Sequence, residues 1–453
     1  MIGVSLSKWT MSYFGVALLA LLGAELLMVV GFGFPSQPMA APQTLVLVHL
    51  VAIGWLSLLL SGALIQFVPV LVAKSLSHPD LPAVALGLLV AGLAGLMAGF
   101  LGMAGFHLDS PLWLPLGAIG LIAGFTLNIW NLGRTIWSAW PINLPAWFVV
   151  AGLASLAGVV VLGTIFSLVL SGWTSNAALL HLTAEGIPLH PALGLGGWLT
   201  FTAMGVSYRL LAMFMLSPEA EHRTSHVALV AGVGAIAVIA IGGPVCLLVF
   251  GQAVSHLLLA ALALGIVSLG LYGYDIVRLY RNRKRRKVEL NALMAAWALA
   301  VLGLAGLLLL ILTAVGEIDR FAGAVVFLFA FGWLTGLGLA KLYKIVAFLT
   351  WLECYGGLLG KRPTPRVQDL VNEPRAMPWF RIYFASVGIA AIAAFLTAPL
   401  VFRIAAFGML VATIGICVQL ASIRMLRSVP TPLLPGEKYP RPRLLLPGLQ
   451  SRR

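Results

Sequence analysis

Residues 49–69 read HLVAIGWLSLLLSGALIQFVP, a stretch that begins with a histidine, ends with a proline and is almost entirely apolar between them. An apolar run of about 20 residues matches the roughly 30 Å hydrocarbon core of a membrane. Because lipid cannot satisfy backbone amides, such a run has to form its own hydrogen bonds as a helix. The stretch therefore predicts a membrane-spanning helix that starts with a side chain able to titrate and to bind a metal.

The rest of the chain extends this pattern. Of its 453 residues, 61% are hydrophobic and 9% are charged, and the mean hydropathy is +1.03. The apolar runs are too long, and too uninterrupted, for the alternating strands of a barrel. We therefore predict an all-α polytopic membrane protein. The expected spans lie near residues 9–33, 43–73, 82–104, 113–138, 145–171, 188–216, 226–250, 254–280, 290–315, 320–351, 380–399 and 401–426.

The basic residues predict the orientation of these twelve spans. The formal net charge is +14, and the run RLYRNRKRRK at 278–287 and a tail at 427–453 carry much of it. With the N-terminus inside, only Arg320 and Arg403 of the 28 lysines and arginines fall on the outer side. This asymmetry indicates that both termini are cytoplasmic, and predicts a multi-pass protein of the inner (cytoplasmic) membrane. The lipid bilayer is the expected partner, and without an aromatic-bearing soluble domain we expect no nucleic acid.

The opening stretch has two further copies in the chain. Residues 54–71 read GWLSLLLSGALIQFVPVL, residues 197–214 read GWLTFTAMGVSYRLLAMF, and residues 332–349 read GWLTGLGLAKLYKIVAFL. After Gly-Trp-Leu-(Ser/Thr), each copy has a small residue and then a polar or basic one. The small residues are Gly62, Gly205 and Ala340, and the polar ones are Gln66, Arg209 and Lys344. Each copy falls on the second helix of a group of four.

We therefore expect one membrane domain over 1–453, built from three pseudo-repeated four-helix blocks at about 9–140, 145–287 and 290–426. The glycines permit close helix contacts. The tryptophans suit either interface anchoring or packing. The three polar positions suit side chains that extend toward water, and Arg209 and Lys344 are also candidates for a proton or ion path.

Twelve helices in three blocks, with a histidine near the outer end of the second helix, resemble the heme-copper oxidase subunit I superfamily. The order His49, Trp55, Gly62 and Pro69 is similar to that in the second helix of the large subunit of nitric oxide reductases. The spacing in this chain is shorter by one residue. The resemblance implies that His49 is an axial ligand of a low-spin heme. It also implies that His190, in LHPALGLGGW, binds an active-site copper or iron.

The same resemblance implies ligands that this chain lacks. The tenth helix should carry His-x-His, but the aligned positions are Val325 and Phe327, and the seventh helix contains no histidine pair. We therefore do not expect a complete terminal oxidase. Any enzymatic activity would be that of a heme-copper-type oxidoreductase.

The remaining residues leave two classes of function open. His49, His190 and His256 all begin helices on the predicted outer side, where three imidazoles could form a copper or iron site. The first class is thus a heme- or metal-binding protein with a respiratory, redox or nitric-oxide-related role, whose partner would be a cytochrome or another respiratory subunit. The second is a cofactor-free transporter or accessory permease for a small solute. Its supporting features are Arg209, Lys344 and Glu25, an acidic residue within the first helix.

Overall fold

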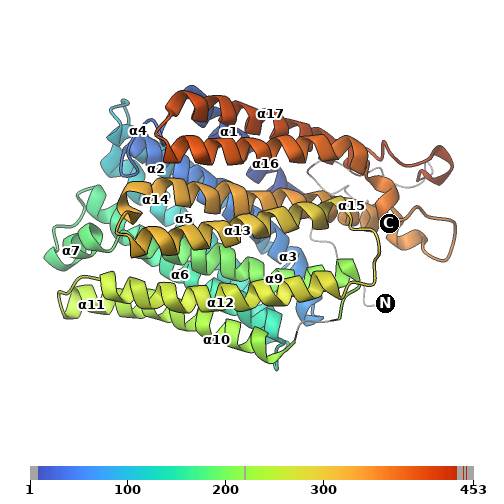
Figure 1. Ribbon diagram of the computed structural model, residues 1–453, viewed down its shortest axis with the longest axis horizontal. Coiled ribbons are helices and arrows are strands. Elements are labelled where there is room, and N and C mark those ends of the chain that lie inside the picture. Colours follow the sequence, from blue (N-terminus) through green and yellow to red (C-terminus); the bar gives the residue numbers. More distant parts are fainter. Residues whose placement is uncertain (1–8, 219–220, 436–441, 443–444, 446–453) are drawn as a thin grey trace. The chain divides into compact units, whose positions relative to one another are not determined.

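The computed structural model describes residues 9–218, 221–435, 442 and 445, and all regular secondary structure in this part of the chain is helical (Figure 1). Eleven helices among the described residues are long and apolar enough to cross a membrane. The chain is therefore a polytopic membrane protein. Only residues 427–435, 442 and 445 of the predicted basic tail are described, and the others lie outside the described residues.

The predicted spans coincide with helical runs, with small shifts at their ends. The eleventh run, predicted at 380–399, begins earlier, at Glu373, because the Asn372 side chain accepts a hydrogen bond from the Arg375 backbone nitrogen. Residues 188–216 form a continuous helical run, Leu189–Met215, which contains Arg209 and is more polar than the eleven candidate spans. A short helix that the hydropathy pattern did not predict as a separate element, α7 (Ala177–Glu185), lies between two of the long runs.

Contacts divide the chain into two units. Unit 2 comprises residues 40–287. Its elements are α2 (Pro42–His49), η1 (Leu50–Ser57), α3 (Leu58–Val72), α4 (Leu81–Met103), α5 (Ser110–Trp137), α6 (Leu144–Leu170), α7, α8 (Leu189–Pro191), η2 (Ala192–Phe201), α9 (Thr202–Met215), α10 (Arg223–Ala237), η3 (Val238–Gly242), α11 (Gly243–Val249) and α12 (Ser255–Arg281).

Unit 1 joins residues 1–39 to residues 288–453, so the first long helix belongs with the last ones. Its elements are α1 (Thr10–Val30), α13 (Leu290–Ala314), α14 (Ile318–Phe327), η4 (Leu328–Thr335), α15 (Gly336–Tyr355), η5 (Gly356–Leu358), η6 (Val367–Leu370), α16 (Glu373–Phe395), α17 (Pro399–Arg424) and η7 (Thr431–Leu433). The pairs α1–α17 and α16–α17 pack against each other.

Glycines set the distance between helices in unit 2. A Cβ atom on Gly92 of α4 would lie 2.5 Å from the backbone nitrogen of Leu121 on α5, so only glycine allows these two backbones to approach so closely. Gly205 of α9 likewise has no room for a Cβ, because Phe148 of α6 occupies that position. The close contact expected at Gly205 is therefore confirmed.

The three copies of the Gly-Trp-Leu-(Ser/Thr) stretch all adopt π-helix, in η1, η2 and η4. A further π segment, η3, continues from α10. π-Helix is rare and usually occurs as single wide turns, often at functional sites. The repeat tryptophans are buried, with exposed fractions of 0% for Trp55, 2% for Trp198 and 0% for Trp333. Of the two roles considered for them, packing is the one the structure supports.

Candidate metal centre

Two of the predicted site residues lie next to each other in unit 2. His49 is the last residue of α2, and His190 is the middle residue of α8. Their ring centres are 6.3 Å apart, and the ring planes are inclined at 34°. Two metal–nitrogen bonds of about 2 Å each, together with the distance from each ring centre to its nitrogen, span roughly this separation. Both imidazoles are therefore close enough to bind a single ion.

The His49 ring is held by its own helix. Its Nδ1 lies 2.8 Å from the Leu45 carbonyl oxygen, one turn earlier, and as the donor in this bond it carries the proton. In the neutral ring the lone pair is then on Nε2. A backbone carbonyl that fixes one nitrogen in this way is the usual support for a metal-binding histidine. Phe100 of α4 packs on the same ring, with ring centres 5.0 Å apart.

The His190 ring has a buried nitrogen without a partner. Its Nδ1 is shielded from solvent and makes no hydrogen bond, whereas the side chain makes a hydrogen bond with the backbone of Val159 on α6. A Cβ atom on Gly163 would lie 3.1 Å from Cε1 of His190, so the missing side chain at 163 makes room for the imidazole. An unsatisfied buried polar atom is costly, which makes it a candidate ligand.

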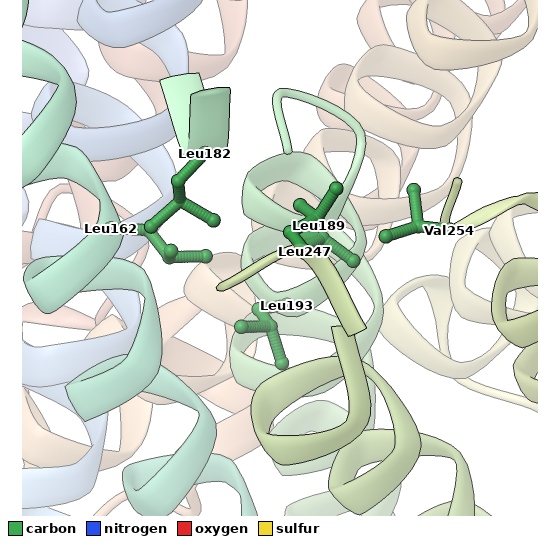
Figure 2. Packing of buried hydrophobic residues seen from close by; sticks show 6 residues of the cluster. All are labelled: Leu162, Leu182, Leu189, Leu193, Leu247 and Val254. Carbon is green, nitrogen blue, oxygen red and sulfur yellow. The ribbon is translucent and has the colours of Figure 1, made fainter. Parts of the chain in front are cut away.

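Apolar packing fixes the backbone around His190. Its neighbours Leu189 and Leu193 belong to a cluster of six buried residues, and Figure 2 shows the side chains of this cluster converging from several elements. The other members are Leu162, Leu182, Leu247 and Val254. Phe166 of α6 also packs on the His190 ring, at 5.7 Å between ring centres. This packing holds the ring in a dry environment, where a neutral imidazole is favoured over a charged one.

π-Helix begins within two residues of both histidines. η1 starts at Leu50, and η2 starts at Ala192, two residues after His190. The two segments are joined by a hydrogen bond in which Trp198 Nε1 donates to Ser57 Oγ over 2.9 Å. Both partners are repeat positions, and their hydrogen bond joins the two helical runs that carry the histidines. The sequence predicted neither the π segments nor this bond.

His256 is placed differently from the other two. It is the second residue of α12, and its side chain is exposed. Among the residues that the structure describes, no group of three or more histidine, cysteine, aspartate or glutamate side chains is arranged to hold a metal ion. The expected convergence of three imidazoles is therefore reduced to the pair His49 and His190.

The two tenth-helix positions where the resemblance implies histidine ligands are filled by apolar packing in unit 1. Val325 and Phe327 are both 4% exposed. The Phe327 ring stacks on Phe331, with ring centres 4.9 Å apart, and meets Phe402 edge-on at 5.2 Å. Phe327 is the repeat equivalent of His49, so the third copy has an aromatic core where the first has a histidine.

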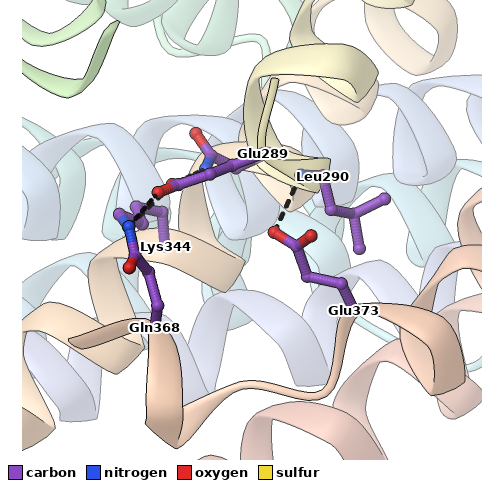
Figure 3. A network of polar contacts seen from close by, with 6 residues as sticks. Glu289, Leu290, Lys344, Gln368 and Glu373 are labelled. Atoms are coloured by element: carbon purple, nitrogen blue, oxygen red, sulfur yellow. Dashed lines mark hydrogen bonds and ion pairs between the residues drawn. The ribbon is translucent and has the colours of Figure 1, made fainter. Parts of the chain in front are cut away.

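Lys344 lies in a buried polar network (Figure 3). Its Nζ is 2.7 Å from Glu289 Oε2, and the two side chains are 11% and 10% exposed. Gln368 of η6 donates to the other Glu289 oxygen over 2.8 Å. Glu373 accepts a hydrogen bond from the backbone nitrogen of Leu290, the first residue of α13. This network joins α13, α15, η6 and α16, so a structural role accounts for Lys344.

Arg209 and Asp275 belong to unit 2. Arg209 lines a small apolar cleft between α3 and α9, whose other lining residues are Leu64, Phe67, Val68, Val70, Leu71, Val206, Leu210 and Met213.

Asp275 of α12 is 1% exposed and accepts hydrogen bonds from the hydroxyls of Tyr208 and Thr224. These two donors satisfy the carboxylate and join α12 to α9 and α10.

Comparison with known proteins adds no assignment. No protein-family model matches the chain, and a comparison with curated proteins finds no match. The functional conclusion therefore depends on the geometry of the site.

Proposed function

We propose that the protein binds a transition metal through His49 and His190, either as a copper or iron ion or as the iron of a heme. The observation that carries this proposal is the buried, unpartnered Nδ1 of His190 beside a second imidazole whose proton is fixed on its own Nδ1, which leaves the Nε2 lone pair free to bind a metal. The short separation of the rings favours one shared centre over a heme at His49 and a separate metal at His190. Imidazole is a common ligand of both copper and heme iron.

Such a centre suits redox or gas-binding chemistry. A bound metal would supply electron transfer or an open position for a small gas, while the protein holds the two imidazoles in fixed tautomers and excludes water. We propose a respiratory, redox or nitric-oxide-related role within a heme-copper oxidase-like scaffold, with a cytochrome or another respiratory subunit as partner. The chain's Val325 and Phe327 argue against a complete terminal oxidase.

A cofactor-free transporter or accessory permease is the second candidate. It is favoured by Arg209, a basic side chain beside an otherwise apolar cleft. The two candidates differ in a simple way, because only the first requires a stoichiometric metal or heme in the purified protein.

Metal and heme content of the purified full-length protein tests the proposal. We expect about one copper or iron per chain by elemental analysis, with a Soret absorption band if the iron is in heme. His49→Ala and His190→Ala should each lose most of the metal. Gly163→Leu should also weaken binding, because its side chain would displace the His190 ring without removing a ligand.

His256→Ala is the matched control, since it removes an exposed imidazole on α12 and should retain the metal. A correctly folded protein, purified from cells supplied with heme, copper and iron, that holds neither metal nor heme and takes up neither copper nor iron would contradict the proposal. Equal losses in all three histidine variants would point to adventitious surface binding and contradict it as well.

We also propose that the chain crosses the membrane twelve times as three four-helix blocks, with both termini cytoplasmic. The common π-helical register of η1, η2 and η4 supports the repeat, and the uninterrupted helix Leu189–Met215 supports the twelfth span. Single cysteines placed at Ser77, Ser138 and Arg283 in a cysteine-free background should react with an impermeant thiol reagent only in inside-out vesicles. Cysteines at His107, Trp173 and Gly316 should react only from the outside. A reversed pattern at Arg283 and Gly316, with the other four positions unchanged, would remove the span at 188–216.

A further inference from the structure

The proposals above leave unexplained a carboxyl group in the core of unit 1. Glu25 lies in the last third of α1 and has an exposed fraction of 0%. The hydroxyl of Thr413 on α17 donates to Glu25 Oε1 over 2.9 Å. The second oxygen, Oε2, is buried and has no hydrogen-bond partner. An ionised carboxylate in this position would lack the donors that normally compensate for lost hydration.

The neighbouring groups offer no compensating positive charge. Tyr383 of α16 and Cys417 of α17 lie near Glu25, and neither carries a positive charge. Within the described part of the chain, no ion pair joins Glu25 to a lysine or arginine. Arg403 of α17 donates to α1 at the Val29 carbonyl oxygen, over 2.8 Å, and so is engaged by the backbone. Unit 1 contains a second buried carboxyl group, that of Glu289, and its oxygen lies 2.7 Å from the Lys344 ammonium group. Glu25 differs from Glu289 in having no such partner among the described residues.

Hydroxyl groups continue from Glu25 toward the π-helical turn of the third copy. Tyr383 donates its hydroxyl to the Phe331 carbonyl oxygen of η4 over 3.0 Å, and Thr335 donates to Ala330 over 2.7 Å. A buried carboxyl that accepts one hydroxyl hydrogen bond and has no basic partner is suited to holding a proton within a membrane.

We propose that Glu25 is a proton-binding site inside the membrane-embedded core of unit 1, neutral when occupied and able to exchange its proton reversibly. The ligand is a single proton on the carboxyl, Thr413 is the hydrogen-bonding neighbour, and no basic side chain takes part. The inference rests only on residues of unit 1 and does not depend on a metal at His49 and His190.

Infrared spectroscopy of the full-length protein in lipid tests this proposal directly. The wild type should show a carbonyl stretching band of a protonated carboxylic acid at neutral pH that is absent from Glu25→Gln. The band should disappear at high pH and return when the pH is lowered. Thr413→Val removes the donor that favours the charged form, so its band should persist to higher pH than in the wild type. Loss of the band at a lower pH than in the wild type, or at the same pH, would overturn the role given to Thr413.

A hydrophobic carbodiimide gives a second, chemical readout. A protonated carboxyl adds across one C=N bond of the reagent, its oxygen bonding to carbon and its proton moving to nitrogen, and the adduct rearranges to a stable acylurea with no leaving group. Peptide mass spectrometry should find this addition on Glu25 in the wild type, with less at higher pH and none in Glu25→Gln. Glu289, paired with Lys344, is the internal control and should remain unmodified.

The absence of a Glu25-dependent carboxylic acid band at neutral pH would overturn the proposal, and this measurement does not depend on whether the reagent reaches the site. Protection of Glu25 from the carbodiimide by sodium ions at constant pH would assign the site to a metal cation instead of a proton, and would overturn it too.

Discussion

Lys344→Ala is expected to lower the free energy of unfolding by about 3–5 kcal/mol, the cost of leaving one member of a buried ion pair without its partner. Glu289 would keep the hydrogen bonds from Gln368 and Asn291 but lose the ammonium group at 2.7 Å. Because Glu289 directly precedes α13, the loss should loosen the start of that helix as well. Denaturant unfolding of the purified protein in detergent micelles measures the change.

Two variants separate the charge effect from simple truncation. Lys344→Met combined with Glu289→Leu removes both charges at similar volume and should recover much of the stability, because the desolvation cost of the pair disappears with it. Arg320→Ala breaks an exposed pair with Glu317, where the side chains are 71% and 50% exposed, and should change stability by less than about 1 kcal/mol. A Lys344→Ala protein as stable as the wild type would show that the network of Figure 3 is not a structural element.

Trp333→Ala should destabilise the protein by about 3–5 kcal/mol, the range for removing a fully buried large side chain without collapse of the cavity. Trp333 lies inside the π-helical turn η4 and is 0% exposed. If the three copies are equivalent in their packing, Trp55→Ala and Trp198→Ala should have costs of similar size. Thermal unfolding of the three variants in the same detergent makes this comparison.

Trp297→Ala is the control for this series, because its side chain on α13 is 57% exposed and should contribute much less. Trp198→Phe separates packing from hydrogen bonding. This variant keeps an aromatic ring but removes the indole N–H that donates to Ser57. We expect the lost hydrogen bond to lower the free energy of unfolding by about 1 kcal/mol, in addition to the effect of the smaller ring. A large effect at Trp297, equal to that at Trp333, would contradict the packing interpretation.

The helices were predictable, because lipid and water select strongly between apolar and polar segments. Each predicted span lies on a helical run, and the main errors are at ends where polar residues continue a helix beyond the apolar region, as at Glu373. The Gly-Trp-Leu copies were also visible in the sequence. Their π-helical form was not, because α- and π-turns use similar dihedral angles and differ only in which carbonyl each amide reaches.

The site was predictable in its residue types but not in its grouping. His49, His190 and His256 were recognisable as metal-capable side chains, although the expected helix start at His49 is wrong because its helix begins seven residues earlier, at Pro42. Only the packed structure places the first two rings 6.3 Å apart and exposes the third, because the separation depends on which helices are neighbours. The unpartnered Nδ1 of His190 and the space left by Gly163 had no signal in the sequence.

The buried charged residues were also predictable in position but not in their partners. The amino-acid sequence alone is enough to predict a polytopic helical membrane protein in which Glu25, Arg209 and Lys344 are costly, because the cost of a polar group in an apolar segment is a local property. The partners of these residues depend on packing: Lys344 meets Glu289, and Glu25 meets a single hydroxyl, across sequence separations of 55 and 388 residues that no local pattern can bridge.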